Sequence, residues 1–166
     1  MKKKIKKFIL KKNKSKIVCL TAYSKNISKI LDRHCDLVLV GDSMANVLYG
    51  FKNTHKLTLD NIIQHTLSVQ IGIKKSLLVV DMPKNSYSNL TKALQSAKLI
   101  MRLTKCEAVK LESNKKNYNI IKRLVKKDIP VMGHIGYTPQ FKKKFKVEGD
   151  TKAKANLLLD EALRIE

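Results

Sequence analysis

Short apolar runs and longer periodic segments alternate along the chain. The short runs are rich in β-branched and other apolar residues, as buried strands are, and they cover residues 17–21, 37–40, 77–81, 108–112 and 129–134. The longer segments repeat apolar residues every three or four positions, which predicts helices over residues 24–34, 59–71, 89–103, 118–127 and 152–165. Strand and helix therefore alternate five times, and this order favours a parallel sheet with right-handed crossovers.

Polar residues stand at the ends of four consecutive predicted strands. In an open doubly wound sheet these residues would form a row, whereas in a barrel the carboxyl ends of the strands converge on one mouth. Such clustering favours an α/β fold of the (β/α)8 TIM-barrel type, of which about five βα units are present. The residues concerned are Asp42, Asp81, the pair Lys110 and Glu112, and His134.

The three acidic residues among them indicate a metal site. A single Asp after a strand is often only the N-cap of the next helix, so neither Asp42 nor Asp81 alone would indicate metal binding. Together with Glu112 they place three carboxylates at one mouth, where they repel one another unless a cation lies between them. Oxygen ligands without His or Cys indicate a hard cation such as Mg²⁺. We therefore predict that Asp42, Asp81 and Glu112 bind Mg²⁺.

Lys110 and His134 each allow two interpretations. Lys110 lies two residues before Glu112 on the same face of its strand, so it either pairs with a substrate carboxylate or neutralises Glu112. His134 either hydrogen-bonds a bound ligand or is a histidine satisfied within the core. Two residues of the predicted helix over residues 59–71 have simpler interpretations, His65 as a member of a packed polar network and Asp60 as a favourable charge in the first helical turn.

The composition adds a strong positive charge. The 166 residues carry a formal net charge of +22, and 43% of them are hydrophobic, which is enough for one domain with a core. Nearly all of the charge is lysine spread along the chain, whereas nucleic-acid recognition favours arginine. We therefore expect nucleic acid to bind only nonspecifically. The alternative function is that of a catalytically inactive, basic nucleic-acid-binding α/β fragment.

The N-terminal segment and the cysteines indicate in which cellular compartment the protein resides. We divide the chain into a lysine-rich leader, residues 1–15, and a barrel part, residues 16–166. The leader is not followed by the apolar core of a signal peptide, and no long uncharged apolar run occurs, so we expect a cytoplasmic protein without a membrane span. Three cysteines without CxxC spacing favour buried free thiols over a disulfide or zinc site, and they are Cys19, Cys35 and Cys106.

Five motifs occur in an order and spacing that resemble the ketopantoate hydroxymethyltransferase family over about residues 16–166. Each motif alone is weak, but the ordered series is specific, and Thr58, Asp60 and His65 also match the second helix of the family. The motifs are Leu20-Thr21-Ala22-Tyr23, then Val40-Gly41-Asp42-Ser43, then Asp81-Met82-Pro83 with Ser86-Tyr87, then Val109-Lys110-Leu111-Glu112, and finally Gly133-His134-Ile135-Gly136-Tyr137-Thr138-Pro139-Gln140.

The resemblance implies a metal-assisted one-carbon transfer. The family binds 3-methyl-2-oxobutanoate to Mg²⁺, makes its enolate and adds a one-carbon unit from 5,10-methylenetetrahydrofolate, which gives ketopantoate in the first step of pantothenate biosynthesis. By this resemblance Asp42 and Asp81 bind the metal, and Glu112 holds it directly or through water. The residues that the resemblance places against the oxo acid are Asp42, Ser43, Asp81 and Lys110, with His134 nearby.

The resemblance also implies that the chain is truncated after its fifth βα unit. Family members are longer and form homo-oligomers, and their general-base glutamate lies in the part that we expect to be missing. No catalytic residue is therefore assigned here, and we expect the 166-residue chain to be weakly active or inactive. Five strands cannot close a barrel, so we expect open sheet edges. A second polypeptide that supplies the remaining units is the alternative.

Overall fold

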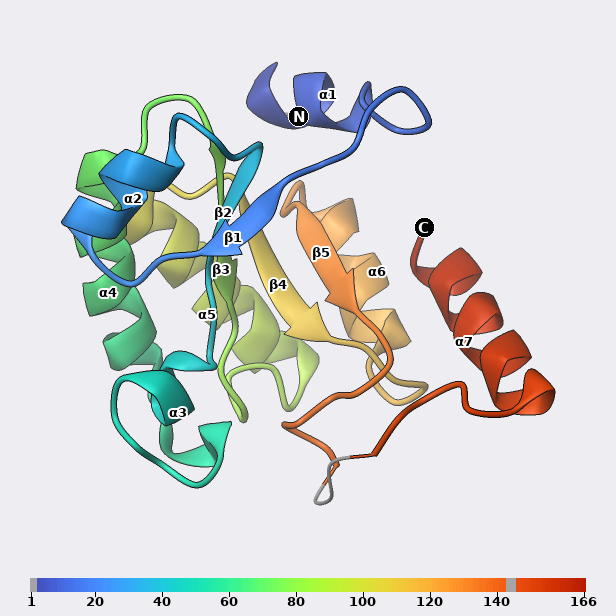
Figure 1. The fold of residues 1–166 in the computed structure, drawn as a ribbon. Coiled ribbons are helices and arrows are strands. Elements are labelled where there is room, and N and C mark those ends of the chain that lie inside the picture. The colour runs from blue at the N-terminus through green and yellow to red at the C-terminus, as the bar shows by residue number, and fades with distance from the viewer. Residues whose placement is uncertain (1–2, 143–145) are drawn as a thin grey trace.

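Five parallel strands form one sheet in the order in which they occur along the chain (Figure 1). The computed structural model describes residues 3–142 and 146–166. A doubly wound sheet reverses its strand order at a switch point, whereas this sheet never does, so the structure confirms barrel-type winding over the open alternative. The strands are β1 (Cys19–Thr21), β2 (Leu37–Val40), β3 (Leu77–Asp81), β4 (Ala108–Glu112) and β5 (Val131–His134).

All five predicted helices are present, and three further short elements were not predicted. The predicted helices are α2 (Lys25–Leu31), α4 (Leu59–Gly72), α5 (Leu90–Thr104), α6 (Tyr118–Lys126) and α7 (Lys152–Ile165). The additional elements are α1 (Lys3–Ile9), α3 (Met44–Val47) and the 3-10 helix η1 (Thr54–Lys56). The first and last strands each begin two residues later than predicted, since their paired registers start at Cys19 and at Val131.

The main core lies between the sheet and the helices that cover its outer face. Along β3, Leu78 and Val80 face this core, where they meet apolar side chains of α4 and α5 such as Ile62 and Ile100. Because side chains alternate across a strand, Leu77, Val79 and Asp81 must point to the opposite, inner face. The same alternation in β4 sends Lys110 and Glu112 inward. The strand pattern therefore brings the polar residues to one side of the sheet.

A second, smaller apolar cluster on the inner face is covered by α1. Ile5 is buried there and packs with side chains from β2, β3 and β4, and Phe8 lies alongside it. Lys4 anchors the helix, because its Nζ donates to the carbonyl oxygen of Ser76 at 3.0 Å and lies 3.4 Å from Glu107 Oε1. The lysine-rich leader is thus not separate from the sheet in its described part. Figure 1 shows α1 beside the amino ends of the strands.

The sheet has an open edge on each side. Among the described residues, β1 pairs only with β2 and β5 only with β4, so five strands form an incomplete barrel, as expected. Leu20 on β1 is 47% exposed. Helix α7 approaches β5 through Ile165, whose Cγ2 would lie 2.4 Å from a Cβ added to Gly133, but none of its side chains is buried. Strands at an edge bury less surface than strands in the middle of a sheet.

None of the three cysteines forms a disulfide in the described part of the chain, although they are not all buried. Cys106 is buried and Cys35 is half-buried, while Cys19 is exposed. The prediction of buried thiols is therefore wrong for Cys19, because that residue lies on the edge strand β1. No helix in the described part of the chain has the length and apolar character needed to cross a membrane.

Candidate active site

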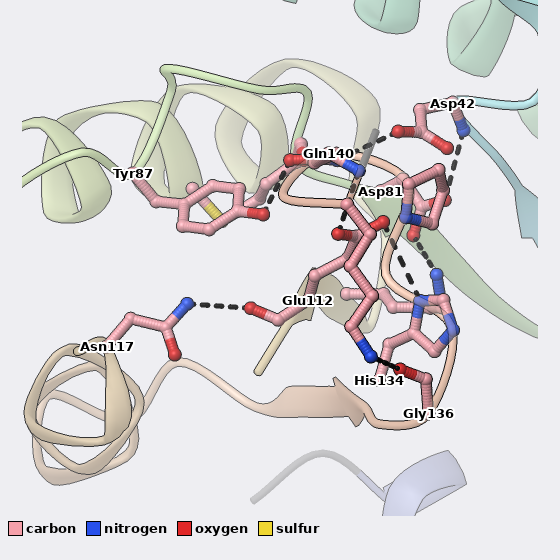
Figure 2. Close-up of polar contacts among 12 residues, drawn as sticks. Asp42, Asp81, Tyr87, Glu112, Asn117, His134, Gly136 and Gln140 are labelled. Carbon is pink, nitrogen blue, oxygen red and sulfur yellow. Dashed lines mark hydrogen bonds and ion pairs between the residues drawn. The ribbon is translucent and has the colours of Figure 1, made fainter. Parts of the chain in front are cut away.

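Three acidic side chains lie at the carboxyl ends of β2, β3 and β4 (Figure 2). Asp42 follows β2, Asp81 ends β3 and Glu112 ends β4, and their exposed fractions are only 7%, 4% and 3%. The backbone N–H of Asp42 donates to Oδ2 of Asp81 at 3.0 Å. Parallel pairing in register places these strand ends side by side, so residues far apart in the chain enter one hydrogen-bonded network.

Lys110 forms a buried ion pair with Asp81. Its Nζ donates to Oδ1 of Asp81 at 2.8 Å, and both side chains are largely removed from solvent. Burial raises the pKa of Asp81; Lys110 lowers it and the nearby charge of Asp42 raises it, so that the pKa lies above its ordinary value. Glu112 was one of the two expected partners of Lys110, but the structure pairs Lys110 with Asp81 instead. A lysine on a buried strand needs such a partner.

Gln140 connects two of the acidic residues, Asp42 and Glu112, and the sequence interpretation missed this role. Its Nε2 donates to Oδ2 of Asp42 at 2.8 Å and to the carbonyl oxygen of Met82 at 3.1 Å. Its backbone N–H donates to Oε2 of Glu112 at 3.0 Å, and the hydroxyl of Tyr87 donates to its Oε1 at 2.5 Å. The only signal in the sequence was its place at the end of the last motif. Figure 2 shows Gln140 between Tyr87 and Asp42.

Glu112 and His134 lie close together without forming an ion pair. Nδ1 of His134 is 4.0 Å from Oε1 of Glu112. Burial raises the pKa of Glu112 to about 8, while burial and the charge of Lys110 lower the pKa of His134. Both shifts favour the neutral forms at neutral pH. Nδ1 of His134 is buried and has no hydrogen-bond partner among the described residues, so this side chain is not satisfied in the way a core histidine is.

The expected metal site is not preformed as three converging carboxylates. No group of three or more His, Cys, Asp or Glu side chains within residues 3–142 and 146–166 is arranged to hold a metal ion. Lys110 donates a hydrogen bond to Asp81, and Gln140 donates one to a carboxylate oxygen of Asp42 and one to a carboxylate oxygen of Glu112. The donor set still consists of buried carboxylate oxygens, which suits a hard cation. Oδ1 of Asp42 and Oε1 of Glu112 accept no hydrogen bond from the described residues.

Ser43 and His65 belong to a second polar network beside the acids. Ser43 is exposed, and its Oγ lies 2.8 Å from the hydroxyl of Tyr23. His65 holds the same tyrosine, since its Nδ1 is 2.8 Å from the carbonyl oxygen of Tyr23 and its Nε2 is 3.0 Å from the hydroxyl of Tyr49. The interpretation of His65 as a polar-network residue is confirmed. Asp60 lies in the first turn of α4, also as predicted.

A cavity of about 700 Å³ adjoins this site. Tyr87 and Gln140 belong both to its wall and to the network of the acids. Phe141 packs edge-on against Tyr87, with ring centroids 6.2 Å apart, and is 51% exposed. The basic residues of the lining are Lys84, Lys115, Lys116 and Lys142. Aromatic walls with lysines around them suit an anionic ligand that carries a planar ring.

The solved structures that resemble this chain share its fold. A 2,3-dimethylmalate lyase of the PEP mutase/isocitrate lyase superfamily aligns over 99% of this chain and 58% of its own, with a TM-score of 0.68 and 12% identity. A phosphonopyruvate hydrolase solved with oxalate and Mg²⁺ aligns over 80% of this chain and 52% of its own, with a TM-score of 0.64 and 9% identity. These likenesses show a TIM-barrel fold and nothing beyond the fold.

Sequence relatives share one name. The 3-methyl-2-oxobutanoate hydroxymethyltransferase of Pelagibacter ubique is 56% identical over all 166 residues, which span 65% of its length. The enzyme of the same name from Rhizobium etli is 49% identical over 125 residues, or 75% of this chain and 46% of its own. The chain thus spans about two thirds of the first relative and less of the second. Because the family model described as ketopantoate hydroxymethyltransferase also matches residues 2–166, the chain belongs to the ketopantoate hydroxymethyltransferase family.

Proposed function

We propose that this chain supplies the metal and 2-oxo acid site of a 3-methyl-2-oxobutanoate hydroxymethyltransferase. In the proposed reaction, 3-methyl-2-oxobutanoate, 5,10-methylenetetrahydrofolate and water give ketopantoate and tetrahydrofolate. The observation that carries the proposal is the buried network of Asp42, Asp81 and Glu112 at the mouth of the sheet, with Lys110 within it. Barrel enzymes keep their active sites at this end of the strands.

The metal of the proposed reaction would be Mg²⁺, held by Asp42 and Asp81 and, directly or through water, by Glu112. A bound Mg²⁺ would stabilise the negative charge that develops on the keto oxygen when the neighbouring carbon loses its proton. The chain's own support for this assignment is its donor chemistry, namely buried carboxylate oxygens whose mutual repulsion a cation would relieve. The Mg²⁺ of the phosphonopyruvate hydrolase structure is a property of that protein and is consistent with the assignment.

Three further side chains are proposed to hold the oxo acid. Lys110 would add a positive charge next to the developing anion, and its ion pair with Asp81 holds it in place. His134 would donate or accept a hydrogen bond through its unpartnered Nδ1. Ser43 would contribute its exposed hydroxyl, which Tyr23 orients. Together they surround the acids with groups that can contact a small carboxylate.

The adjoining cavity is the proposed site of the folate co-substrate. Its lysines would neutralise carboxylates, and the exposed face of Phe141 would stack on a planar ring. We expect the substitution Lys115→Glu to weaken binding of 5-formyltetrahydrofolate about fivefold, or ~1 kcal/mol. Fluorescence titration measures this, with Lys98→Glu on the exposed face of α5 as the control. Equal affinities of the two variants would show that the co-substrate does not bind in this cavity.

Calorimetric titration of the 166-residue chain tests the main proposal. We expect 3-methyl-2-oxobutanoate to bind only when Mg²⁺ is present, because the carboxylates of the site repel an anion until a cation joins them. Asp81→Asn should abolish this binding, whereas His34→Ala, which changes an exposed histidine outside the site, should leave it unchanged. Binding is the right measurement because the chain spans 65% of its first relative. Failure to bind the oxo acid at any Mg²⁺ concentration would refute the proposal.

A further inference from the structure

We infer that Gln140 is a positioning residue that sets the distances between the carboxyl ends of β2, β3 and β4. It lies in the loop that connects β5 to α7, and only 2% of its surface is exposed. Its side chain reaches Asp42 beyond β2 and Met82 beyond β3, and its backbone reaches Glu112 at the end of β4. A single residue thus joins three strand ends. What it positions for catalysis rests on the function proposed above.

Both the donor nitrogen and the acceptor oxygen of the Gln140 side chain form hydrogen bonds. A glutamine amide has two N–H donors and a carbonyl acceptor. Nε2 donates to Asp42 and to Met82, while Oε1 accepts from the hydroxyl of Tyr87 (Figure 2). A glutamate of the same size would keep the acceptor but lose both donors, and it would add a negative charge beside Asp42. The pattern therefore requires an amide at this position.

The bonds made by Gln140 engage one carboxylate oxygen of Asp42 and one of Glu112, and they leave the other oxygen of each without a hydrogen bond from the described residues. Oδ2 of Asp42 and Oε2 of Glu112 are held by its two nitrogens, at 2.8 and 3.0 Å. Oδ1 of Asp42 and Oε1 of Glu112 accept no hydrogen bond from the residues that the structure describes. Ligating carboxylates are commonly oriented in this way, by a partner on the oxygen that does not bind the metal.

The loop that carries Gln140 is itself anchored on both sides. The backbone N–H groups of Phe141 and Lys142 donate to the carbonyl oxygen of Thr138 at 3.0 and 2.9 Å, which forms a turn around Gln140. Nε2 of His55 lies 3.2 Å from the carbonyl oxygen of Pro139. These anchors hold the loop without touching the acids. They therefore offer a control that loosens the loop and leaves the contacts of Gln140 in place.

The test compares Gln140→Leu and Gln140→Glu with the loop control His55→Ala. Removing an outer partner of a metal ligand typically costs about 10- to 100-fold in metal affinity. We expect a loss of that size in the Mg²⁺-dependent affinity for 3-methyl-2-oxobutanoate, measured by calorimetry, for both Gln140 variants. His55→Ala should change the affinity less than about threefold, even where urea unfolding shows a comparable loss of stability. Equal losses of affinity in all three variants would show that Gln140 only holds the loop in place, and they would overturn the inference.

A second measurement keeps this inference separate from the proposed function. The backbone N–H of Asp42 donates to Asp81, so its hydrogen exchange reports on the spacing of β2 and β3 without any ligand. We expect Gln140→Leu to accelerate exchange at Asp42 at least tenfold while the amides of β2 itself change little, as judged by NMR. Unchanged exchange at Asp42 would overturn the inference even if the wild-type chain binds no oxo acid. Absence of oxo acid binding in the wild type would refute only the proposed function.

Discussion

At the scale of single residues, the candidate site is defined by charged groups that are buried and only partly paired. Asp81 has a cationic partner in Lys110, whereas the carboxyl group of Glu112 accepts a hydrogen bond from Gln140 and forms no ion pair with a lysine or arginine among the described residues. Burial therefore raises the pKa of Glu112 to about 8, which is far above the ordinary value of a carboxyl group. A cluster that keeps carboxyl groups buried without full compensation is typical of sites that bind ligands.

Substitution of His134 tests whether its unpartnered nitrogen serves a ligand. We expect His134→Ala to weaken the binding of 3-methyl-2-oxobutanoate about three- to tenfold, because one hydrogen bond contributes about 0.5–1.5 kcal/mol. Mg²⁺ affinity should not change, since Nδ1 lies 4.0 Å from Glu112 and contacts neither of the two aspartates. Calorimetry in the presence of Mg²⁺ measures both quantities. An unchanged affinity for the oxo acid would show that His134 does not contact this ligand.

At the scale of elements, α1 shows how a lysine-rich sequence can still form part of a core. Ile5 and Phe8 are three residues apart and lie on one face of the helix, where they cover the inner cluster of the sheet. Three lysines of the helix are exposed, namely Lys3, Lys6 and Lys7. The lysine-rich composition of residues 1–15 hides this short apolar face from an inspection of the sequence alone.

Truncation of Ile5 measures the contribution of α1 to stability. We expect Ile5→Ala to lower the free energy of unfolding by about 2 kcal/mol, because buried Ile→Ala changes usually cost about 2–5 kcal/mol and this site lies at the margin of the core. Ile9→Ala on the same helix is the matched control, since Ile9 is 51% exposed. Urea unfolding compares the two variants. Equal stabilities would show that α1 does not pack on the sheet in solution.

Asp32 fastens the end of α2 to the start of β3. Its carboxylate accepts hydrogen bonds from the backbone N–H groups of Lys74, Lys75 and Ser76 at 2.8–3.1 Å. Burial acts to raise the pKa of Asp32, but these hydrogen bonds outweigh it and hold the pKa below its ordinary value. A carboxyl group with a lowered folded-state pKa stabilises the protein above its unfolded-state pKa. That stabilisation is lost as the pH falls through the folded-state pKa.

Asp32→Asn should therefore act mainly at neutral pH. We expect it to reduce the free energy of unfolding by about 2 kcal/mol at pH 7, the size of a lost set of charge-assisted hydrogen bonds. Below about pH 4 the difference from the wild type should shrink, because the wild-type carboxyl group then becomes protonated as well. Thermal melts at pH 7 and at several pH values below about 4 measure the trend, and Asp160→Asn on the exposed side of α7 is the control. A difference that persists at low pH would contradict the assignment.

At the scale of the whole molecule, two opposing features govern association. The open edges β1 and β5 present unpaired backbone and apolar side chains, which favour contact between copies. The net charge of +22 repels copies at low ionic strength and is screened by salt. Association should therefore increase with salt over the range in which screening becomes effective.

Sedimentation velocity at low and high salt tests this balance. We expect the wild-type chain to sediment faster at high salt, and Leu20→Lys to suppress the change, because a charge on an edge strand opposes pairing with another edge. Ile71→Lys is the control, since Ile71 is 65% exposed and lies on helix α4 instead of an edge strand. Sedimentation that does not respond to salt would show that the edges are protected.

The net charge of +22 also predicts nonspecific binding to nucleic acid. A protein that binds through phosphate contacts loses affinity steeply as counterions compete. We expect the affinity for a short DNA duplex, measured by fluorescence anisotropy, to fall at least about tenfold between ~50 and ~200 mM salt and to be independent of base sequence. Affinity that depends on sequence would revive the alternative of a nucleic-acid-binding module.

The sequence by itself determined the order of the elements and the placement of the acids at the strand ends. Both follow from local periodicity, because alternation along each strand decides which side chains point inward, as for Asp81 and Glu112. Only the tertiary structure decided the partners. Lys110 pairs with Asp81, 29 residues away, and Gln140 reaches Asp42 across 98 residues. Such contacts depend on strand register and loop path, which no short stretch of sequence specifies.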